Sequence, residues 1–467
     1  MDLETISAIA TPIGKGGIGI VRLSGPRAIS IVDPLLRIGK KSPEAHASGV
    51  RSSRSHLLKY GKIVDPRRNQ IIDEVLVVVM RAPHSYTRED VVEIQSHSGH
   101  VILASILNLV LDCGARLAQP GEFTKRAFLN GRIDLSQAEA VAEVISARSE
   151  TALQLATTHL GGHMRSAVDN LIEKIVALQV DIEAHIEFPD ELEEKIDLAS
   201  LESDLESKVM GPIDDLLDQY QEGHLLRDGV RLGIVGRPNV GKSSLLNRLV
   251  RKEKAIVTPI AGTTRDLIED QTSIEGLPVL ITDTAGLRAS TDPIEIVGIQ
   301  RTRQSIATSD IVLFVVDGSQ PFSEEDREVF DAVRERNYIL CFNKSDLKGV
   351  AKKTTPDAIL NFSPSVDISA KTGEGIDALK NAVKDLCLSE AQIDPGSAIV
   401  ANLRQKAALE QAAGALNRVL SGMRAKVGEE LFVSDLSAAR TALEEVIGWH
   451  VDGEILDEVF KKFCIGK

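Results

Sequence analysis

Four short stretches of this chain have the residue types and spacing of a site that binds a nucleoside triphosphate. The first is Gly236–Ser243, whose sequence GRPNVGKS fits the phosphate-binding loop G-x-x-x-x-G-K-[ST] between a strand and a helix. Its glycines allow backbone N–H groups to converge on a polyphosphate. Lys242 is placed to reach the β- and γ-phosphates, and the Ser243 hydroxyl to bind Mg²⁺. An ordinary Gly-rich turn is the alternative, but the flanking strand and helix patterns favour the nucleotide site.

The other three stretches each follow an apolar, strand-like segment. They are Asp283–Gly286 (DTAG), Asn343–Asp346 (NKSD) and Ser369–Lys371 (SAK). The carboxyl ends of parallel strands meet at one edge of a sheet, so the four stretches are predicted to surround one ligand. Asp283 is expected to hold the Mg²⁺ shell and the Gly286 N–H to meet the γ-phosphate.

Asp346 determines the predicted base. Its carboxylate can accept two hydrogen bonds from guanine, one from the ring N–H and one from the exocyclic amine, whereas adenine presents an acceptor and no amine there. An unpaired buried polar group costs about 1–3 kcal/mol, and more when it is charged. GTP is therefore predicted to bind at least tens of times more tightly than ATP.

Hydrolysis in this chain cannot use the glutamine that Ras-like enzymes place after D-x-x-G, because Leu287 occupies that position. A leucine side chain cannot orient a water molecule. Downstream, Glu295 is a candidate for that role. From the residues alone, a surface acid is an equal alternative, and it remains open.

The chain is predicted to have several domains, because 467 residues correspond to about three domains. The elements that position the four stretches belong to one of them. Residues 228–387 alternate apolar strands with helices and predict an α/β P-loop GTPase (Ras-like) domain. Residues 1–119 predict an α+β N-terminal domain. Residues 120–227 and 388–467 are helical, so we predict a discontinuous α-helical domain into which the α/β domain is inserted. Two separate helical units are the alternative.

Hydrophobic periodicity gives the individual elements. The predicted strands are Ile6–Ala10, Gly19–Leu23, Glu74–Met80, Val91–Gln95, Val230–Val235, Val279–Thr282, Ile311–Val316, Tyr338–Phe342 and Val366–Ile368. The predicted helices are His100–Asp112, a continuous helix from a capping box at Ser136–Glu139 to Leu160, Met164–Ile186, one or two within Glu191–Glu222, Ser244–Val250, Ile399–Met423, Val433–Gly448 and Gly453–Phe463.

Composition limits the class of protein. The net charge of −14 disfavours indiscriminate binding to nucleic acid, although a local basic patch at Arg51, Arg54, Lys59, Lys62, Arg67 and Arg68 is an alternative to a plain solvated face. The four cysteines form no C-x-x-C pair, which favours a reducing compartment. No apolar run approaches the length of a membrane span. These features predict a cytoplasmic protein that does not bind membranes.

Two smaller features are interpreted as structural. The glycine-rich segment Thr11–Gly17 resembles a second anion-binding loop, but no helix follows it, so a plain loop is favoured. His97 and His100 have the spacing of one helix face, yet Gly99 lies between them and no third ligand is evident, so no metal site is predicted there.

Several longer runs resemble the MnmE (TrmE) family of tRNA-modification GTPases across the whole chain. These runs are Ala10–Pro12, Pro120–Asn130, Phe188–Asp190, the phosphate loop with Asn239, Ile260–Asp266, Asp283–Arg288 and the C-terminal Cys464–Lys467. The GTPase motifs alone indicate only the superclass. The N-terminal runs and the C-terminal tetrapeptide CIGK are far more specific.

The resemblance implies the residues of the GTP site. The GTP-binding residues would be Asn239, Val240, Gly241, Lys242, Ser243, Ser244, Thr258, Pro259, Ile260, Ala261, Gly262, Thr263, Thr264, Asp283, Thr284, Ala285, Gly286, Asn343, Lys344, Asp346, Ser369, Ala370 and Lys371. K⁺ would be held by Asn239, Thr258, Ile260 and Thr263, and Mg²⁺ by Ser243 and Thr264. Glu295 matches the family's water-positioning acid, the catalytic residue. A cation between the phosphates could replace an arginine finger.

The resemblance also implies a folate site in a dimerising N-terminal domain. Arg22, Glu93, Arg132 and Lys467 match positions that contact 5-formyl-tetrahydrofolate or a related folate, although Arg132 stands where the family can carry lysine. Cys464 is part of the family's C-terminal mark. Its thiol is either a participant in the chemistry or an inert cysteine, and the sequence leaves both open.

As a function, the resemblance implies a K⁺-dependent GTPase that acts as a homodimer and forms a heterotetramer with an FAD-dependent MnmG (GidA)-type partner. Together they would convert C5 of the wobble uridine (U34) of certain tRNAs to aminomethyl- or carboxymethylaminomethyl-uridine, with tetrahydrofolate as one-carbon carrier. The alternative is a regulatory or ribosome-assembly GTPase without carbon chemistry. The C-terminal part lacks the basic G-x-x-G loop expected for an RNA-binding module of that second class.

Overall fold

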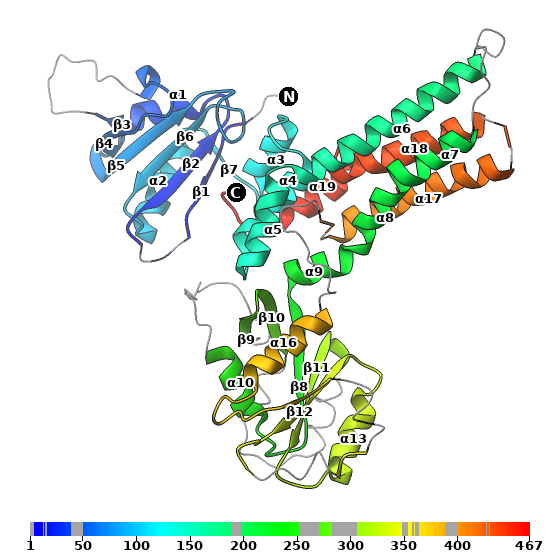
Figure 1. The fold of residues 1–467 in the computed structure, drawn as a ribbon. Coiled ribbons are helices and arrows are strands. Elements are labelled where there is room, and N and C mark those ends of the chain that lie inside the picture. The colour runs from blue at the N-terminus through cyan, green and yellow to red at the C-terminus, as the bar shows by residue number, and fades with distance from the viewer. Residues whose placement is uncertain are drawn as a thin grey trace. The chain divides into compact units, whose positions relative to one another are not determined.

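The computed structural model describes residues 4–12, 14, 16–38, 50–187, 198–251, 270–282, 306–347, 354–356, 359, 364–387, 399–400, 402–425, 427–428 and 430–467. The chain divides into two compact units, which are Met1–Ala142 with Ile447–Lys467, and Glu143–Val446 (Figure 1). The segment boundaries drawn from the sequence stay a prediction. Within the described ranges, no helix has the length and apolar character needed to cross a membrane.

The first unit is built on a seven-stranded sheet with the order β3-β4-β5-β6-β2-β1-β7. Its side chains bury a core with the helix α2, which includes Leu103, Ile106 and Val110. The elements are β1 Ile6–Ile9, β2 Gly19–Ser24, α1 Ala28–Val32, the 3₁₀ turns Asp33–Leu35 and Val50–Ser52, β3 Leu36–Arg37, β4 Lys59–Asp65, β5 Gln70–Met80, β6 Val91–Ser96, α2 His100–Asp112 and β7 Arg116–Leu117. The four strands and the helix predicted here are confirmed, whereas β3, β4 and β7 were not predicted.

The sheet brings Arg22 and Glu93 together. Strands β2 and β6 pair antiparallel, and their register places Arg22 opposite Glu93. Residues directly opposite on neighbouring strands lie on the same face, with their side chains in contact. Both residues lie within their strands rather than at the strand ends.

Helices complete the first unit: α3 Glu122–Leu129, the start of α4 Leu135–Ser146, and α19 Gly453–Lys461. Ala138 of α4 packs with Phe460 and Phe463, so the C-terminal segment shares a core with α4. The chain then ends beside α3, where the Phe123 N–H donates to the Lys467 carbonyl at 3.2 Å.

The expected helix from Ser136 to Leu160 is wrong in two respects. Its cap is Asp134, whose carboxylate accepts from the Gln137 N–H at 2.9 Å while the Gln137 side chain accepts from the Asp134 N–H at 3.0 Å. The capping box is therefore shifted by two residues. The helix also ends at Ser146, and Ser149 caps a new helix, α5 Glu150–Leu160, by accepting from the Ala152 N–H.

The second unit contains helices from both sides of the α/β segment. They are α5, α6 His163–Glu187, α7 Leu198–Leu205, a π turn at Glu206–Met210, α8 Gly211–Asp218, α9 Tyr220–Asp228, α17 Leu403–Ala425 and α18 Glu430–Ile447. The helical predictions here are confirmed with shifted ends. Helix α17 packs on α7 and α8, and Arg424 forms ion pairs with Glu202 and Glu206. The two flanks thus associate as helical partners.

The α/β segment has a six-stranded sheet with the order β13-β12-β11-β8-β10-β9. The five predicted strands are confirmed and pair parallel, while β9 adds an antiparallel edge. Strands β11 and β12 are buried along their whole length, as expected where helices cover both faces. The elements are β8 Val230–Val235, α10 Lys242–Arg251, β9 Asp270–Ile274, β10 Leu277–Thr282, β11 Ile311–Asp317, α13 Glu324–Val333, β12 Tyr338–Asn343, β13 Ser365–Asp367 and α16 Ile376–Cys387.

The two chain segments that lead into and out of this α/β segment meet at Gly223. A Cβ at Gly223 on α9 would lie 2.5 Å from the Val400 carbonyl oxygen and 2.7 Å from Ile399 Cγ2. Only glycine allows that approach without a shift. Leu155 and Leu226 also belong to the apolar core that includes Val230 and Leu277, so helices α5 and α9 pack directly against the sheet.

Candidate functional site

The phosphate loop follows β8 and ends in α10, as its sequence predicts. Gly236 and Gly241 have φ of +150° and +101°, and a Cβ at either would overlap the Val315 carbonyl oxygen or Asn343 Nδ2. The glycines therefore allow the loop to lie against β11 and β12. Lys242 Nζ donates to the Gly236 and Arg237 carbonyls at 2.6 and 2.8 Å. These bonds hold the ammonium group across the loop.

Asn343, the first residue of N-K-x-D, joins two of the predicted stretches. Its Nδ2 donates to the Val240 carbonyl at 2.7 Å, and its Oδ1 accepts from the Ala370 N–H at 2.9 Å. The side chain is buried, so these bonds are made away from water. The asparagine thus fixes the spacing between the phosphate loop and the S-A-K stretch.

Asp346 is oriented by a neighbour from the S-A-K stretch. The Ser369 hydroxyl donates to Asp346 Oδ1 at 2.7 Å and accepts from the Thr372 N–H at 3.1 Å. Arg248 on α10 ties the same stretch to the phosphate loop's helix, because its Nε donates to the Ala370 carbonyl at 3.3 Å. The structure therefore brings the phosphate loop, N-K-x-D and S-A-K to one end of the sheet.

Two supporting ion pairs were missed from the sequence. Asp317 ends β11 and accepts from Lys344 Nζ at 2.6 Å, which holds the lysine of N-K-x-D. Burial pushes the Asp317 pKa upward, but hydrogen bonds from Lys344 and Ser319 outweigh it and lower that pKa overall. Arg237 ion-pairs with buried Asp326 at the start of α13, at 3.3 Å. Asp317 could have been recognised from the sequence as a site residue, since it is an acid at the carboxyl end of an apolar strand.

The remaining predicted GTP-site residues lie outside the described part of the chain. These are Thr258 to Thr264, with the predicted K⁺ ligands Thr258, Ile260 and Thr263 and the predicted Mg²⁺ ligand Thr264, then Asp283 to Gly286, and Glu295. Of the predicted metal ligands, Asn239 and Ser243 are described. Asn239 has a left-handed backbone with φ of +63°, and Ser243 lies in the first turn of α10.

In the first unit, the predicted folate residues Arg22 and Glu93 form a pair beside the C-terminal segment. Arg22 Nε and Glu93 Oε1 form an ion pair at 2.7 Å, with side chains 19% and 15% exposed. Arg22 also donates to the Gly466 carbonyl at 3.3 Å and lies 5.6 Å from the Phe123 ring centroid. Gly466, at φ +94°, packs against the backbone of Ile9 and Ala10. The tetrapeptide Cys464–Lys467 therefore lies beside β1 and β2, and Cys464 is exposed.

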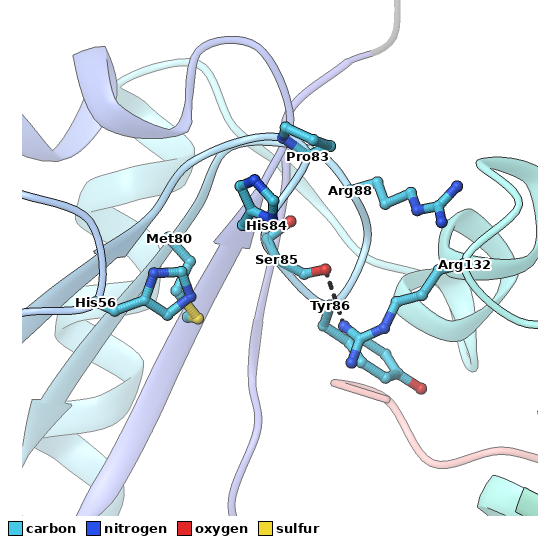
Figure 2. A pocket seen from close by; sticks show the side chains of 8 residues that line it. All are labelled: His56, Met80, Pro83, His84, Ser85, Tyr86, Arg88 and Arg132. Carbon is cyan, nitrogen blue, oxygen red and sulfur yellow. Dashed lines mark hydrogen bonds between the residues drawn. The ribbon is translucent and has the colours of Figure 1, made fainter. Parts of the chain in front are cut away.

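Arg132 lines an open pocket of about 520 Å³ in the same unit. Its guanidinium carbon lies 4.9 Å from the Tyr86 ring centroid, and its NH1 donates to the Ser85 carbonyl at 2.8 Å (Figure 2). The pocket is lined by His56, Met80, Pro83, His84, Ser85, Tyr86, Arg88 and Arg132. Sequence reasoning had named only Arg132 among them.

The alternatives raised from the sequence have simpler explanations. His97 Nδ1 lies 2.9 Å from Asp73 Oδ1, and within the described ranges no group of three or more His, Cys, Asp or Glu residues could hold a metal ion. In the basic segment, Lys62 pairs with Glu74 at 2.8 Å and Arg67 with Asp112 at 3.0 Å. These partners favour a solvated, charge-paired face.

Comparison with known proteins gives matches over the whole length. The family profile described as the MnmE helical domain matches residues 135–464, and the one described as the GTP-binding protein TrmE N-terminus matches residues 5–132. The curated "tRNA modification GTPase MnmE" of Listeria welshimeri is 42% identical over 470 residues, covering 100% of both chains. The protein of the same name from Syntrophobacter fumaroxidans is 45% identical over 99% of this chain and 98% of its own.

Among solved structures, the chain is similar to Era of Aquifex aeolicus bound to GDP and aluminium fluoride. The match has 27% identity, covers 40% of this chain and 66% of that one, and has a TM-score of 0.26. So low a score carries no structural argument. The full-length sequence matches carry the relationship instead.

Proposed function

This chain belongs to the MnmE family of tRNA modification GTPases, and we propose that it hydrolyses GTP to drive modification of the wobble uridine of tRNA. The proposal rests on the similarity of the whole chain to MnmE proteins, together with the hydrogen bonds around Asn343. That side chain links the phosphate loop to the base-recognition stretches in one site. GTP binding and hydrolysis follow from the family; the acceptor chemistry is the proposed part.

In the proposed reaction, each predicted site residue has a separate task. Asp346, held by Ser369, would accept the two guanine N–H groups, and Lys242 would meet the β- and γ-phosphates. Ser243 and Thr264 would hold Mg²⁺, while Asn239, Thr258, Ile260 and Thr263 would hold K⁺. The ions, when bound, would neutralise charge that develops on the phosphates. Glu295 would position the attacking water, in place of the glutamine replaced by Leu287.

The K⁺ requirement has a direct test. We expect the steady-state GTPase rate to be at least roughly tenfold higher in K⁺ than in Na⁺ at equal ionic strength, because a cation that stabilises the transition state must match its ligand cage. Glu295→Ala is expected to lose turnover and keep GTP affinity. Equal rates in the two salts would remove K⁺ from the proposal, and a Glu295→Ala protein with normal turnover would remove Glu295.

We propose that the one-carbon transfer to the uridine depends on the first unit. Arginine suits the carboxylates of a folate and Glu93 suits the N–H donors of its pterin ring, so the Arg22–Glu93 group, with Arg132 and Lys467, would bind the cofactor. Bound tetrahydrofolate would carry the one-carbon unit. We propose a homodimer that works in the cytoplasm with an FAD-dependent MnmG-type partner, as a heterotetramer, to install an aminomethyl or carboxymethylaminomethyl group at C5 of U34.

Nucleoside analysis of tRNA from a deletion strain tests the carbon chemistry. We expect C5-modified wobble uridines to disappear and to return when the gene is restored. A strain carrying the Asp346→Asn protein serves as a control for the need for GTP. If the wobble uridines stay modified in the deletion strain, the second candidate, a regulatory or ribosome-assembly GTPase, is favoured. Ribosome profiles of the deletion strain would then be the next measurement.

A further inference from the structure

The pocket at Arg132 is lined by basic residues without acids, whereas the chain as a whole has more acidic than basic residues. Of its eight lining residues, two are arginines and two are histidines, and none is an acid. The whole chain has 68 acidic against 54 basic residues. A pocket with two arginines and no acid is therefore unusual for this sequence, and it favours an anionic ligand.

The two arginines of the pocket are held by backbone carbonyls. Arg132 donates to the Ser85 carbonyl, and Arg88 NH1 donates to the Asn130 carbonyl at 2.9 Å. In turn, Asn130 Nδ2 donates to the Thr87 carbonyl at 2.7 Å, which ties the end of α3 to the loop before β6. Figure 2 shows Arg132 lying along the Tyr86 ring, with Arg88 beside it. Both cations are therefore placed before any ligand arrives.

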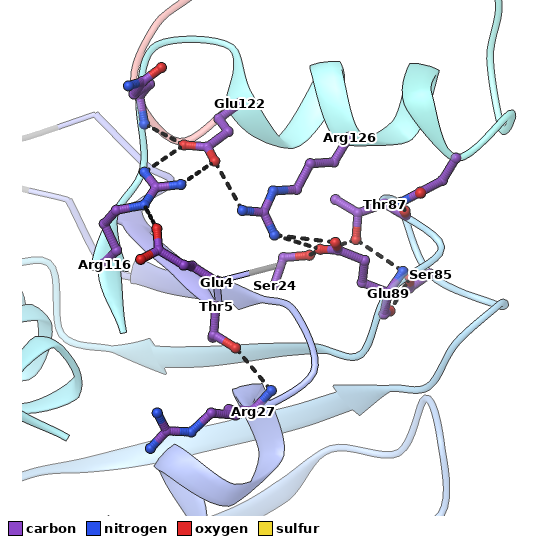
Figure 3. Close-up of polar contacts among 12 residues, drawn as sticks. Glu4, Thr5, Ser24, Arg27, Ser85, Thr87, Glu89, Arg116, Glu122 and Arg126 are labelled. Atoms are coloured by element: carbon purple, nitrogen blue, oxygen red, sulfur yellow. Dashed lines mark hydrogen bonds and ion pairs between the residues drawn. The ribbon is translucent and has the colours of Figure 1, made fainter. Parts of the chain in front are cut away.

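The nearest acids are already engaged elsewhere. Glu89 accepts from Arg126 NH1 and from the Ser24 hydroxyl, while Glu122 is bound by both Arg126 and Arg116 (Figure 3). Asp90 accepts from the Ala82 N–H at 3.1 Å. These carboxylates are bonded within the fold, and none of them lines the pocket.

Tyr86 connects this pocket to the Arg22–Glu93 pair. The Tyr86 hydroxyl is hydrogen-bonded to the Thr124 hydroxyl at 3.0 Å, and its ring packs in the small core that includes Phe123. Arg22 lies over that same Phe123 ring. Burial raises the Tyr86 pKa, and both Arg132 and Arg22 are near enough to oppose that rise. Contacts through Tyr86 and Phe123 therefore connect Arg132 of the pocket with the Arg22–Glu93 pair.

We propose that the pocket binds the tail of γ-linked glutamates on a folate whose pterin ring lies at the Arg22–Glu93 pair. The inference rests on the proposed folate site. A pterin ring has several N–H donors, which suit the carboxylate of Glu93 better than a pocket that has no acid. Each added glutamate brings one α-carboxylate, which suits a row of cations. His56, His84 and Arg88 are exposed, so tails of different length can be accommodated.

Titration of the full-length protein with 5-formyl-tetrahydrofolate carrying one or four glutamates tests this inference. The three added carboxylates should tighten binding roughly tenfold in total, since each exposed ion pair contributes only a small factor. High salt should reduce the gain. The double variant His56→Asn with Arg88→Asn should keep the affinity for the monoglutamate and lose most of the gain.

The variants are chosen to preserve the backbone. His56 and Arg88 have φ of +64° and +57°, a conformation that asparagine adopts readily. Arg68→Asn, an equal loss of charge on an exposed residue outside the pocket, is the control and should leave the gain unchanged.

Each other result overturns the inference. If the monoglutamate binds and tail length has no effect, or if the double variant keeps the full gain, the tail does not use this pocket while the folate site stands. If no folate binds at all, the proposed folate site itself fails. If the double variant keeps the gain but loses affinity for tRNA in a filter-binding assay, the cations serve RNA phosphates instead.

Discussion

Asp346→Asn is expected to lower the affinity of the protein for GTP roughly 10³-fold, because two guanine N–H groups lose their acceptor and each unpaired group costs about 1–3 kcal/mol. The wild-type carboxylate is held by the Ser369 hydroxyl at 2.7 Å. An asparagine amide at the same place turns an N–H donor toward the N–H donors of guanine. Xanthosine triphosphate, which carries a carbonyl in place of the guanine amine, should bind the variant better than GTP does.

Equilibrium titration with GTP and with xanthosine triphosphate measures this exchange. Asp377→Asn, an exposed acid on α16, is the matched control and should bind GTP as the wild type does. Unchanged GTP affinity in Asp346→Asn would show that the base lies elsewhere. Loss of both nucleotides with a folded domain would show that Asp346 supports the site without reading the base.

Lys242→Ala is expected to lower GTP turnover by about 10²–10³-fold, the effect of removing one preorganised donor from a developing phosphate charge. The ammonium group is fixed before nucleotide binds, because the Gly236 and Arg237 carbonyls both accept from it. Burial lowers the Lys242 pKa, and the phosphates of a bound nucleotide would favour the charged form again.

Phosphate release and nucleotide affinity, measured separately, show whether the loss lies in binding or in turnover. Lys384→Ala removes an exposed lysine from α16 of the same domain and should change neither. A Lys242→Ala protein with normal turnover would mean that another cationic group binds the phosphates in place of Lys242.

The strands of the α/β segment could be predicted because buried parallel strands have continuous apolar sequences. Strands β11 and β12 are of this kind, and both were found. Strand β4 was missed, since KYGKIVD has a glycine and two lysines among its first four residues and so lacks a clear apolar alternation. The break between α4 and α5 was missed because the alanine-rich pattern continues across it. There a local side chain, Ser149, restarts the helix.

The motif residues of the nucleotide site could be predicted, because each belongs to a short stretch whose chemistry is local. The contacts that these residues make could not be predicted from local sequence. Asn343 bonds to residues 103 and 27 positions away, and Lys344 to an aspartate 27 positions away. The Arg22–Glu93 pair likewise depends on the register of β2 against β6, which periodicity does not determine.

The contact between Gly223 and Val400 also bears on how the α/β segment is joined to the helices. The segments entering and leaving it touch at one glycine, so its two ends lie close together, as they do where one domain is inserted into another. A short join between α9 and α17 could therefore span the gap left by its removal. The removal would still expose apolar surface on α5 and α9, because Leu155 and Leu226 belong to the core of the sheet.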